Sequence, residues 1–371
     1  MKSVGIITMH GVRNYGSFMQ AYATQQSIEK LGYRAEIIDY CYPNELHGFR
    51  KPSFQSRILH AASSLVKSLL PGNPYRTLNR RWNNACARYY HLSRPYASRS
   101  SLIENPPIYD IYLVGSDQVW NERFIRKDNT FFAAFAPPSA RKVAFGSSFG
   151  CLEVSDRAFY KSNLMSLQSI AIRESSGVRL AESITGRTDI QHVLDPSFLL
   201  SAQEWRDIST DVPKRKRNYI FIYGSNAEDY ILSTAKALAR ENDLDILRCN
   251  GSALDYFRKD VHYVLDAGPL EWLSLIDGAA LVIACSFHGI AFSIQFNRPF
   301  IGIRLGNEQY DSRMDGLLAQ FGLSDSSLTV GDKMVLDFDK ISRIDWGEIN
   351  HILEEQRQSS LHVLKDMLQW D

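Results

Sequence analysis

An apolar run that ends in a polar turn and is followed by a second apolar run constrains the fold most strongly. Residues 279–284, AALVIA, contain no polar side chain and have the length of a strand buried on both faces of a parallel sheet. The polar turn at 286–289 leads into a stretch with helical spacing, and the second apolar run, 299–303, ends in Arg304. The segment therefore predicts a strand–helix–strand unit of an open α/β sheet.

Two cationic residues stand where the strands of this unit are expected to end. His288 lies in the turn that opens the helix, and Arg304 follows the second strand. In open α/β sheets, ligands bind beyond the carboxyl ends of the strands, where helix N-termini attract anions. We therefore expect an anion pocket with His288 and Arg304 in its wall.

Strand and helix patterns alternate along the rest of the chain. Strand patterns occupy residues 4–9, 35–40, 111–114, 142–146, 169–172, 192–194, 219–223, 244–247 and 262–264, and helical patterns occupy residues 17–31, 227–240, 270–278 and 346–369. This alternation predicts βαβ units with parallel sheets. The 371 residues exceed what one core usually holds. We expect two Rossmann-like domains facing across a cleft, a GT-B-like α/β fold, at 1–205 and 206–345, and a C-terminal helix at 346–371.

Composition excludes several classes of protein. The five cysteines are scattered without metal-ligand spacing, which favours reduced thiols and a cytoplasmic location. Because the first residues run directly into a strand, no signal peptide is expected, and no apolar run has the length of a membrane span. No sequence cluster demands a metal ion, so neither a metal nor a cofactor is expected.

A basic insertion occupies residues 46–103. It contains ten Lys and Arg residues and no Asp or Glu, and an amphipathic run fills residues 54–70. A basic amphipathic helix can lie on the inner face of an anionic membrane, so peripheral contact is one hypothesis. The alternatives are a core-facing helix with a solvated basic face and a surface for an acidic acceptor such as a lipid pyrophosphate. Four basic residues at 214–217 fit a solvated linker rather than a nucleic-acid patch.

Four segments in order resemble one known family. They are NYGS at 14–17, VGSDQVWN at 114–121, LDPSFLL at 194–200, and SFHG at 286–289 with FNRPF at 296–300. Together these segments resemble the polysaccharide pyruvyl transferases. The resemblance implies the GT-B architecture, with an acceptor-binding N-terminal domain and a donor-binding C-terminal domain.

The resemblance also implies a reaction. Pyruvate moves from phosphoenolpyruvate onto two hydroxyls of a sugar as a cyclic ketal, and phosphate is released. Phosphoenolpyruvate is a substrate rather than a cofactor, and the acceptor is a sugar of a polysaccharide or of its lipid-linked precursor. Such a small anionic donor has to be held by Arg, His and backbone N–H groups.

The expected donor residues lie in both halves of the chain. His288 is the candidate acid or phosphate ligand, with a helix-capping histidine as the structural alternative. The resemblance makes Arg173 a donor ligand, whereas a structural ion pair with Glu174 is the other interpretation. The family often carries Arg two residues before the histidine, but Ser286 stands here. The missing guanidinium could come from Arg298, Arg304 or Arg313.

The acceptor side is expected in the first domain. Asp117 follows the strand pattern at 111–114 and is the candidate general base, or else the N-cap of the next helix. The first strand-to-helix turn is expected to bind the acceptor and consists of Asn14, Tyr15, Gly16 and Ser17.

Two other functions remain open at the level of sequence. One is a GT-B glycosyltransferase that uses a nucleotide sugar. Such enzymes usually hold the ribose with a carboxylate, whereas residues 286–307 contain no Asp or Glu. The other is a catalytically degenerate glycan-binding protein, which the Ser286 substitution would suit.

Overall fold

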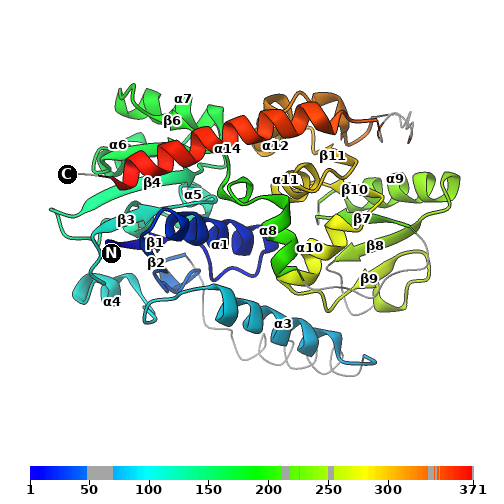
Figure 1. Cartoon of the computed structure of the whole chain (residues 1–371), viewed down its shortest axis with the longest axis horizontal. Coiled ribbons are helices and arrows are strands. Elements are labelled where there is room, and N and C mark those ends of the chain that lie inside the picture. The colour runs from blue at the N-terminus through cyan, green and yellow to red at the C-terminus, as the bar shows by residue number, and fades with distance from the viewer. Residues whose placement is uncertain are drawn as a thin grey trace.

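The protein consists of two parallel-sheet domains side by side (Figure 1). The computed structural model describes residues 1–47, 70–209, 218–224, 226–249, 255–332, 338, 341 and 343–369. Within this part of the chain each domain contains one six-stranded parallel sheet with helices on its faces. The expected GT-B-like α/β architecture is thereby confirmed.

The N-terminal sheet has the strand order β2-β1-β3-β4-β5-β6. Its strands are β1 (Ser3–Ile7), β2 (Arg34–Ile37), β3 (Ile111–Val114), β4 (Arg141–Ser147), β5 (Ser169–Ile172) and β6 (Gln191–His192). Its helices are α1 (Tyr15–Lys30), α3 (Pro74–Tyr89), α4 (Arg99–Glu104), α5 (Glu122–Ile125), α6 (Arg157–Leu164) and α7 (Ser175–Thr185). Asn14 caps α1 by accepting from the Ser17 N–H, and Gly32, at φ +88°, follows the end of this helix.

The C-terminal sheet has the order β12-β11-β10-β7-β8-β9. Its strands are β7 (Tyr219–Tyr223), β8 (Asp245–Cys249), β9 (His262–Val264), β10 (Leu281–Ala284), β11 (Phe300–Arg304) and β12 (Ser327–Thr329). The helices are α8 (Ala202–Ile208), α9 (Glu228–Glu241), α10 (Pro269–Asp277), α11 (Phe287–Gln295), α12 (Glu308–Gln320) and α14 (Trp346–Leu368). The central strand β10 is fully buried, as its apolar sequence predicts.

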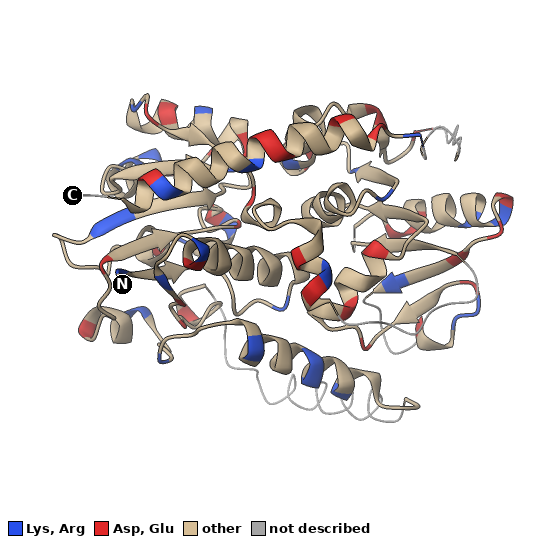
Figure 2. Cartoon of the chain, viewed as in Figure 1, with Lys and Arg blue, Asp and Glu red and all other residues tan. Residues whose placement is uncertain are grey.

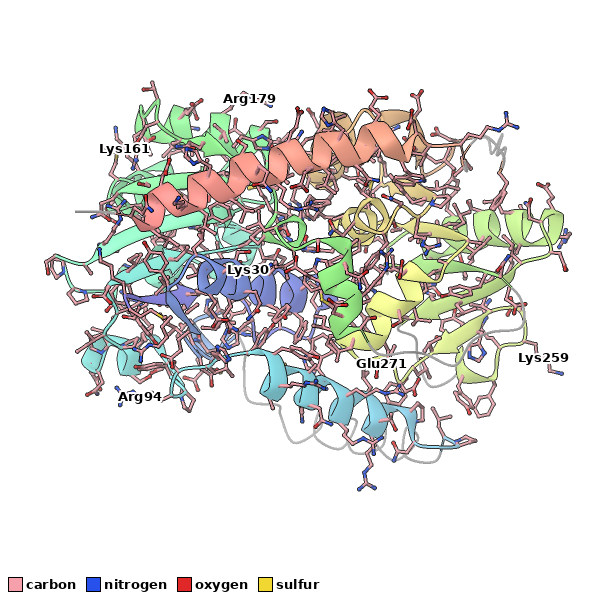
Figure 3. All side chains as sticks on the ribbon, viewed as in Figure 1. Lys30, Arg94, Lys161, Arg179, Lys259 and Glu271 are labelled. Carbon is pink, nitrogen blue, oxygen red and sulfur yellow. The ribbon has the colours of Figure 1, made fainter. Side chains whose placement is uncertain are left out.

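Two helices far apart in the sequence, α14 and α3, connect the two domains. The long helix α14 runs from the C-terminal domain back over the N-terminal one (Figure 1), where Ser360 Oγ accepts from the Leu194 N–H at 2.9 Å. On the other side, α3 lies against α10, the helix that carries Glu271 (Figure 3). Arg81 of α3 contacts Asp266 at 2.6 Å and Glu271 at 3.0 Å. These contacts fix how the domains face each other.

The basic insertion is only partly described. The amphipathic run expected at 54–70 lies outside the described residues except for Leu70, which is buried. The helix α3 carries arginines but no lysine and no acidic side chain (Figure 2), and Arg76, Arg80 and Arg88 are exposed on it. Within the described ranges, no helix combines the length and hydropathy needed to cross a membrane.

Candidate active site

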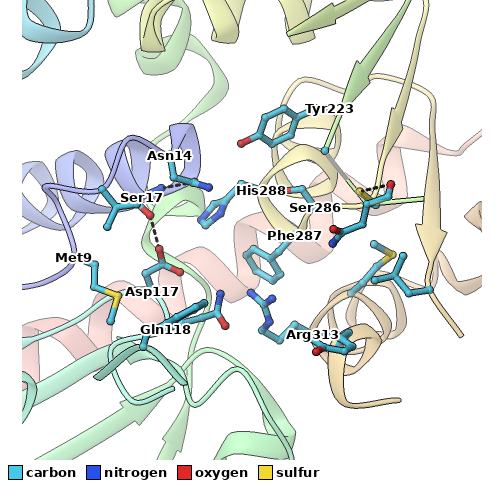
Figure 4. Close-up of a pocket in the computed structure, with 18 of the residues that line it drawn as sticks. Met9, Asn14, Ser17, Asp117, Gln118, Tyr223, Ser286, Phe287, His288 and Arg313 are labelled. Atoms are coloured by element: carbon cyan, nitrogen blue, oxygen red, sulfur yellow. Dashed lines mark hydrogen bonds between the residues drawn. The ribbon is translucent and has the colours of Figure 1, made fainter. Parts of the chain in front are cut away.

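A cavity of about 790 Å³ lies between the domains, beyond the carboxyl ends of β1 and β3 on one side and of β7 and β10 on the other. Both domains contribute polar residues to its wall (Figure 4). From the N-terminal domain come Asn14, Ser17, Asp117 and Gln118, and from the C-terminal domain come Tyr223, Glu228, Arg248, Ser286, His288 and Arg313. Ligand sites of open α/β sheets are expected at such strand ends.

His288 lies at the start of α11, between Asn14 and Ser286 (Figure 4). Its ring packs so closely on Gly16 that a Cβ at position 16 would overlap with it. The His288 Nε2 is buried, lies 3.7 Å from Asp195 Oδ1, and has no hydrogen-bond partner among the described residues. Gly16 therefore makes room for His288, which corrects its expected role as an acceptor ligand.

Asp117 faces His288 from the N-terminal domain. Its carboxylate accepts hydrogen bonds from the Ser17 hydroxyl at 2.7 Å and from an Arg173 N–H at 3.2 Å. Its backbone φ is +70°. Burial alone would raise the pKa of Asp117, but Arg173 and His288 hold it below the ordinary value. The N-cap alternative is wrong, because Asn121 caps α5.

Arg173 lies behind the cavity rather than in its wall. Its side chain is fully buried, with Nη1 2.6 Å from Asp195 and Nη2 3.2 Å from Asp117, and its guanidinium covers the Phe287 ring at 4.8 Å. The expected ion pair with Glu174 is present but is longer, at 3.7 Å. Arg173 therefore does not line the interdomain cavity, where it was expected as a donor ligand, and it contacts the Phe287 ring of the cavity wall instead.

Asp195 was assigned no chemistry from the sequence, yet it connects Arg173 with His288. It is almost completely buried, and although burial would raise its pKa, Arg173 and then His288 hold that pKa far below the ordinary value. Sequence reasoning missed this role because Asp195-Pro196 reads equally well as a structural turn. Burial raises the pKa of the neighbouring Glu174, which Arg173 opposes only in part.

Of the three arginines proposed to replace a guanidinium at position 286, only Arg313 lines the cavity. Its Nε is buried without a hydrogen-bond partner in the described part of the chain. Burial and the nearby Arg173 lower the pKa of Arg313. Arg298 precedes β11, at the opposite end of the sheet, and pairs with Asp277 at 3.1 Å. Arg304 turns to Asp315 at 3.8 Å, which corrects its expected place in the pocket wall.

Of the first strand-to-helix turn, residues 14–17, only two side chains line the cavity. Asn14 and Ser17 line the cavity, whereas Tyr15 is buried, donates its hydroxyl to the Ala267 carbonyl at 2.7 Å, and stacks on Trp272 at 5.4 Å. Tyr15 therefore joins the two domains and is not an acceptor ligand.

Sequence reasoning also missed Arg248, a buried cation in the cavity wall. Its Nη1 lies 3.0 Å from Glu228, and its Nη2 donates to the Gly224 carbonyl at 3.0 Å. The strand pattern was expected to end at residue 247, although β8 extends through Arg248. An arginine at the end of an apolar strand was the available signal. Within the described ranges, no group of three His, Cys, Asp or Glu residues could hold a metal ion.

Comparison with solved structures agrees with this fold. UDP-GlcNAc 2-epimerase from Neisseria meningitidis, bound to UDP-GlcNAc, has a TM-score of 0.50 at 11% identity, with 99% of both chains covered. Arabidopsis thaliana UGT89C1, complexed with quercetin, has a TM-score of 0.48 at 13% identity, with 99% of this chain and 100% of the other covered. At 11% identity the likeness to the epimerase concerns the fold alone, and no conclusion is drawn from the lower TM-score of the second structure.

Comparison of sequences adds the family. A search of curated proteins finds no significant match. Residues 14–307, which include the acceptor turn, Asp117, Arg173, Asp195 and His288, match the family described as polysaccharide pyruvyl transferase. Since this match covers most of the 371 residues, the chain belongs to the polysaccharide pyruvyl transferase family.

Proposed function

We propose that this protein transfers pyruvate from phosphoenolpyruvate onto two hydroxyls of a sugar, forming a cyclic ketal and releasing phosphate. The observation that carries the proposal is the Arg313 Nε, which is buried without a hydrogen-bond partner in the described residues and lies in the same cavity wall as His288. Both side chains belong to the wall of the interdomain cavity. Buried polar groups normally have partners, so a bound anion is the natural occupant of this place.

Arg313 supplies the guanidinium that Ser286 cannot. Within the described residues no ion pair joins Arg313 to a carboxylate, and the nearby Arg173 repels it more strongly than either Asp117 or Glu174 attracts it. An anionic ligand stabilises a partly buried guanidinium that lacks an ion pair, because the ligand replaces the water that the guanidinium has lost. The phosphate or the carboxylate of phosphoenolpyruvate meets this need, since a guanidinium can bind either one bidentately.

In the proposed reaction, the protons and electron pairs balance between substrates and products. The C3 methylene of phosphoenolpyruvate takes up a proton, and the first sugar oxygen bonds to the electron-poor C2. The bond from C2 to the phosphate oxygen then breaks, the electron pair leaves with phosphate, and the second sugar oxygen bonds to C2. One of the two hydroxyl protons is matched by the proton gained at C3, and the other departs with phosphate.

His288 and Asp117 take the proton-handling roles in this proposal. His288 donates from Nε2 to the methylene carbon or to the departing phosphate oxygen, and the Asp195 carboxylate lies 3.7 Å from the same nitrogen. Asp117 accepts the hydrogen bond of the attacking hydroxyl through lone pairs that remain free beside Ser17 and Arg173. Because its pKa is depressed, Asp117 orients the hydroxyl and takes the proton late.

The acceptor is a sugar of a polysaccharide or of its lipid-linked precursor in this proposal. The exposed arginines of α3 would then hold the enzyme beside the anionic inner face of a membrane. The test of the reaction is mass spectrometry of glycan acceptors after incubation with phosphoenolpyruvate. A gain of pyruvate less water, together with stoichiometric phosphate, supports the proposal.

One observation favours a second candidate, transfer from a nucleotide sugar. Glu228, from the C-terminal domain, lines the cavity and is half-exposed, so it offers the carboxylate that residues 286–307 lack. Its pairing with Arg248 at 3.0 Å partly satisfies that carboxylate. Calorimetric titration separates the candidates, because saturation by a UDP-sugar and not by phosphoenolpyruvate reverses the choice. Binding of glycans without turnover of any donor would indicate the degenerate glycan-binding protein.

A further inference from the structure

Two exposed aromatic side chains from different domains line the cavity. Phe124 belongs to α5 and is 41% exposed, and Tyr310 belongs to α12 and is 49% exposed. Scattered exposed aromatics are ordinary, but an apolar surface inside a ligand-sized cavity marks a binding position. We propose that Phe124 and Tyr310 form a stacking platform for a pyranose ring of the acceptor. This subsite for the acceptor rests on the proposed function.

Local contacts hold in place the two helices that carry Phe124 and Tyr310. Asn121 caps α5 and Ile125 is fully buried, whereas Phe124, the residue before Ile125, is exposed. In α12, Asp311 accepts the Leu305 and Asn307 N–H groups, each at 2.9 Å, which fixes the first turn of the helix beside Tyr310. Pre-positioned rings lose little conformational freedom when a ligand stacks on them.

A contact across the cleft joins the two halves of the platform. Arg123, next to Phe124, donates from Nη1 to the Tyr310 hydroxyl at 2.6 Å, and its guanidinium lies 5.0 Å from the centre of the Tyr310 ring. The segment that carries Phe124 is thus tied to Tyr310 across the cleft, although the two aromatic side chains come from different domains.

The chemistry of the rest of the cavity selects a sugar as the occupant. A pyranose has apolar faces made of C–H groups and a rim of hydroxyls. Aromatic rings suit the faces, and the polar side chains of Asn14, Asp117 and Gln118 in the same cavity suit the hydroxyls. Phosphoenolpyruvate has no such face, and about 790 Å³ leaves space beside so small a donor.

The test uses methyl hexopyranosides of glucose, galactose and mannose as probes, with saturation-transfer NMR on the full-length protein. Saturation is expected on the ring protons of at least one probe. Phe124→Ala and Tyr310→Ala are each expected to weaken that binding at least about three-fold, the effect of losing one stacking contact. Tyr310→Phe, which keeps the ring and removes the hydroxyl bonded to Arg123, should retain most of the binding.

Two controls keep the result specific. Met165→Ala removes an exposed apolar side chain that lines none of the described cavities, and it should leave the probe signal unchanged. Phosphoenolpyruvate affinity, measured on the same variants, should also be unchanged. The platform is wrong if no probe receives saturation, or if the signal survives both alanine variants. Absence of phosphoenolpyruvate binding to the wild type would instead contradict the proposed function, because the pyranoside measurement does not depend on the donor.

Discussion

Arg173 donates to Asp195 across 2.6 Å beneath the cleft, in a place where both side chains are fully buried. The same aspartate reaches toward His288 in the cavity wall. Removal of one partner from such a pair leaves an uncompensated buried charge, which is among the costliest changes a single substitution can make. Asp195 therefore links the stability of the N-terminal domain to the orientation of the candidate acid.

The first prediction concerns Asp195→Asn. At neutral pH this variant should lose on the order of 3–5 kcal/mol of unfolding free energy. Because the folded-state pKa of Asp195 is depressed, its stabilisation is present above its unfolded pKa and is lost as pH falls. Urea unfolding should therefore show the gap between wild type and variant shrinking below about pH 4. A gap that stays constant down to pH 3 contradicts the account.

The second prediction concerns Arg313. Arg313→Met should weaken phosphoenolpyruvate binding at least about ten-fold, the scale of one charge-assisted contact. Removal of this cation from beside Arg173 should not destabilise the fold. Arg298→Met is the matched control, since Arg298 pairs with Asp277 away from the cavity. Equal affinities of the two variants in calorimetry would remove Arg313 from the donor site.

The third prediction concerns Gly16→Ala. The added methyl group overlaps with the His288 ring, so either the ring or α1 has to move. Turnover should fall at least about ten-fold, because even an ångström of misplacement costs catalysis heavily. Gly316→Ala, at a helical position with nothing within 4 Å, serves as the control and should leave turnover unchanged. Full activity of Gly16→Ala would show that the packing on His288 has no catalytic consequence.

The fourth prediction concerns the surface of α3. Arg76→Glu with Arg80→Glu should weaken binding to vesicles that contain anionic lipid, because each cation near such a surface contributes about 1 kcal/mol. Vesicle flotation at low salt measures the effect, and neutral vesicles provide the control. If the wild-type protein does not float with anionic vesicles, the peripheral membrane hypothesis is wrong.

Much of the fold could be read from local sequence. The bounds of β3, β5, β7 and β9 match the predicted strands. A short apolar segment between polar turns is most readily buried as a strand of the sheet. The helix at the C-terminus was also predicted within a residue or two. The return of this helix across the N-terminal domain was not predicted, because it depends on contacts between residues that are far apart in the sequence.

The site was only partly predictable for the same reason. Strand ends and helix starts correctly located Asp117, Ser17 and His288 at one cavity. The side on which Arg313 of α12 points, the Phe287 ring in front of Arg173, and the turn of Arg304 toward Asp315 are set by packing. No periodicity in the sequence reports these directions.

The most direct measurement compares wild type with His288→Ala in the mass-spectrometric assay with phosphoenolpyruvate and a glycan acceptor. We predict ketal formation by the wild type, and turnover lowered by about 10²-fold or more in the variant, as expected for loss of a general acid. Far-ultraviolet circular dichroism should show both proteins folded. Undiminished turnover in the folded variant would contradict the central role of His288.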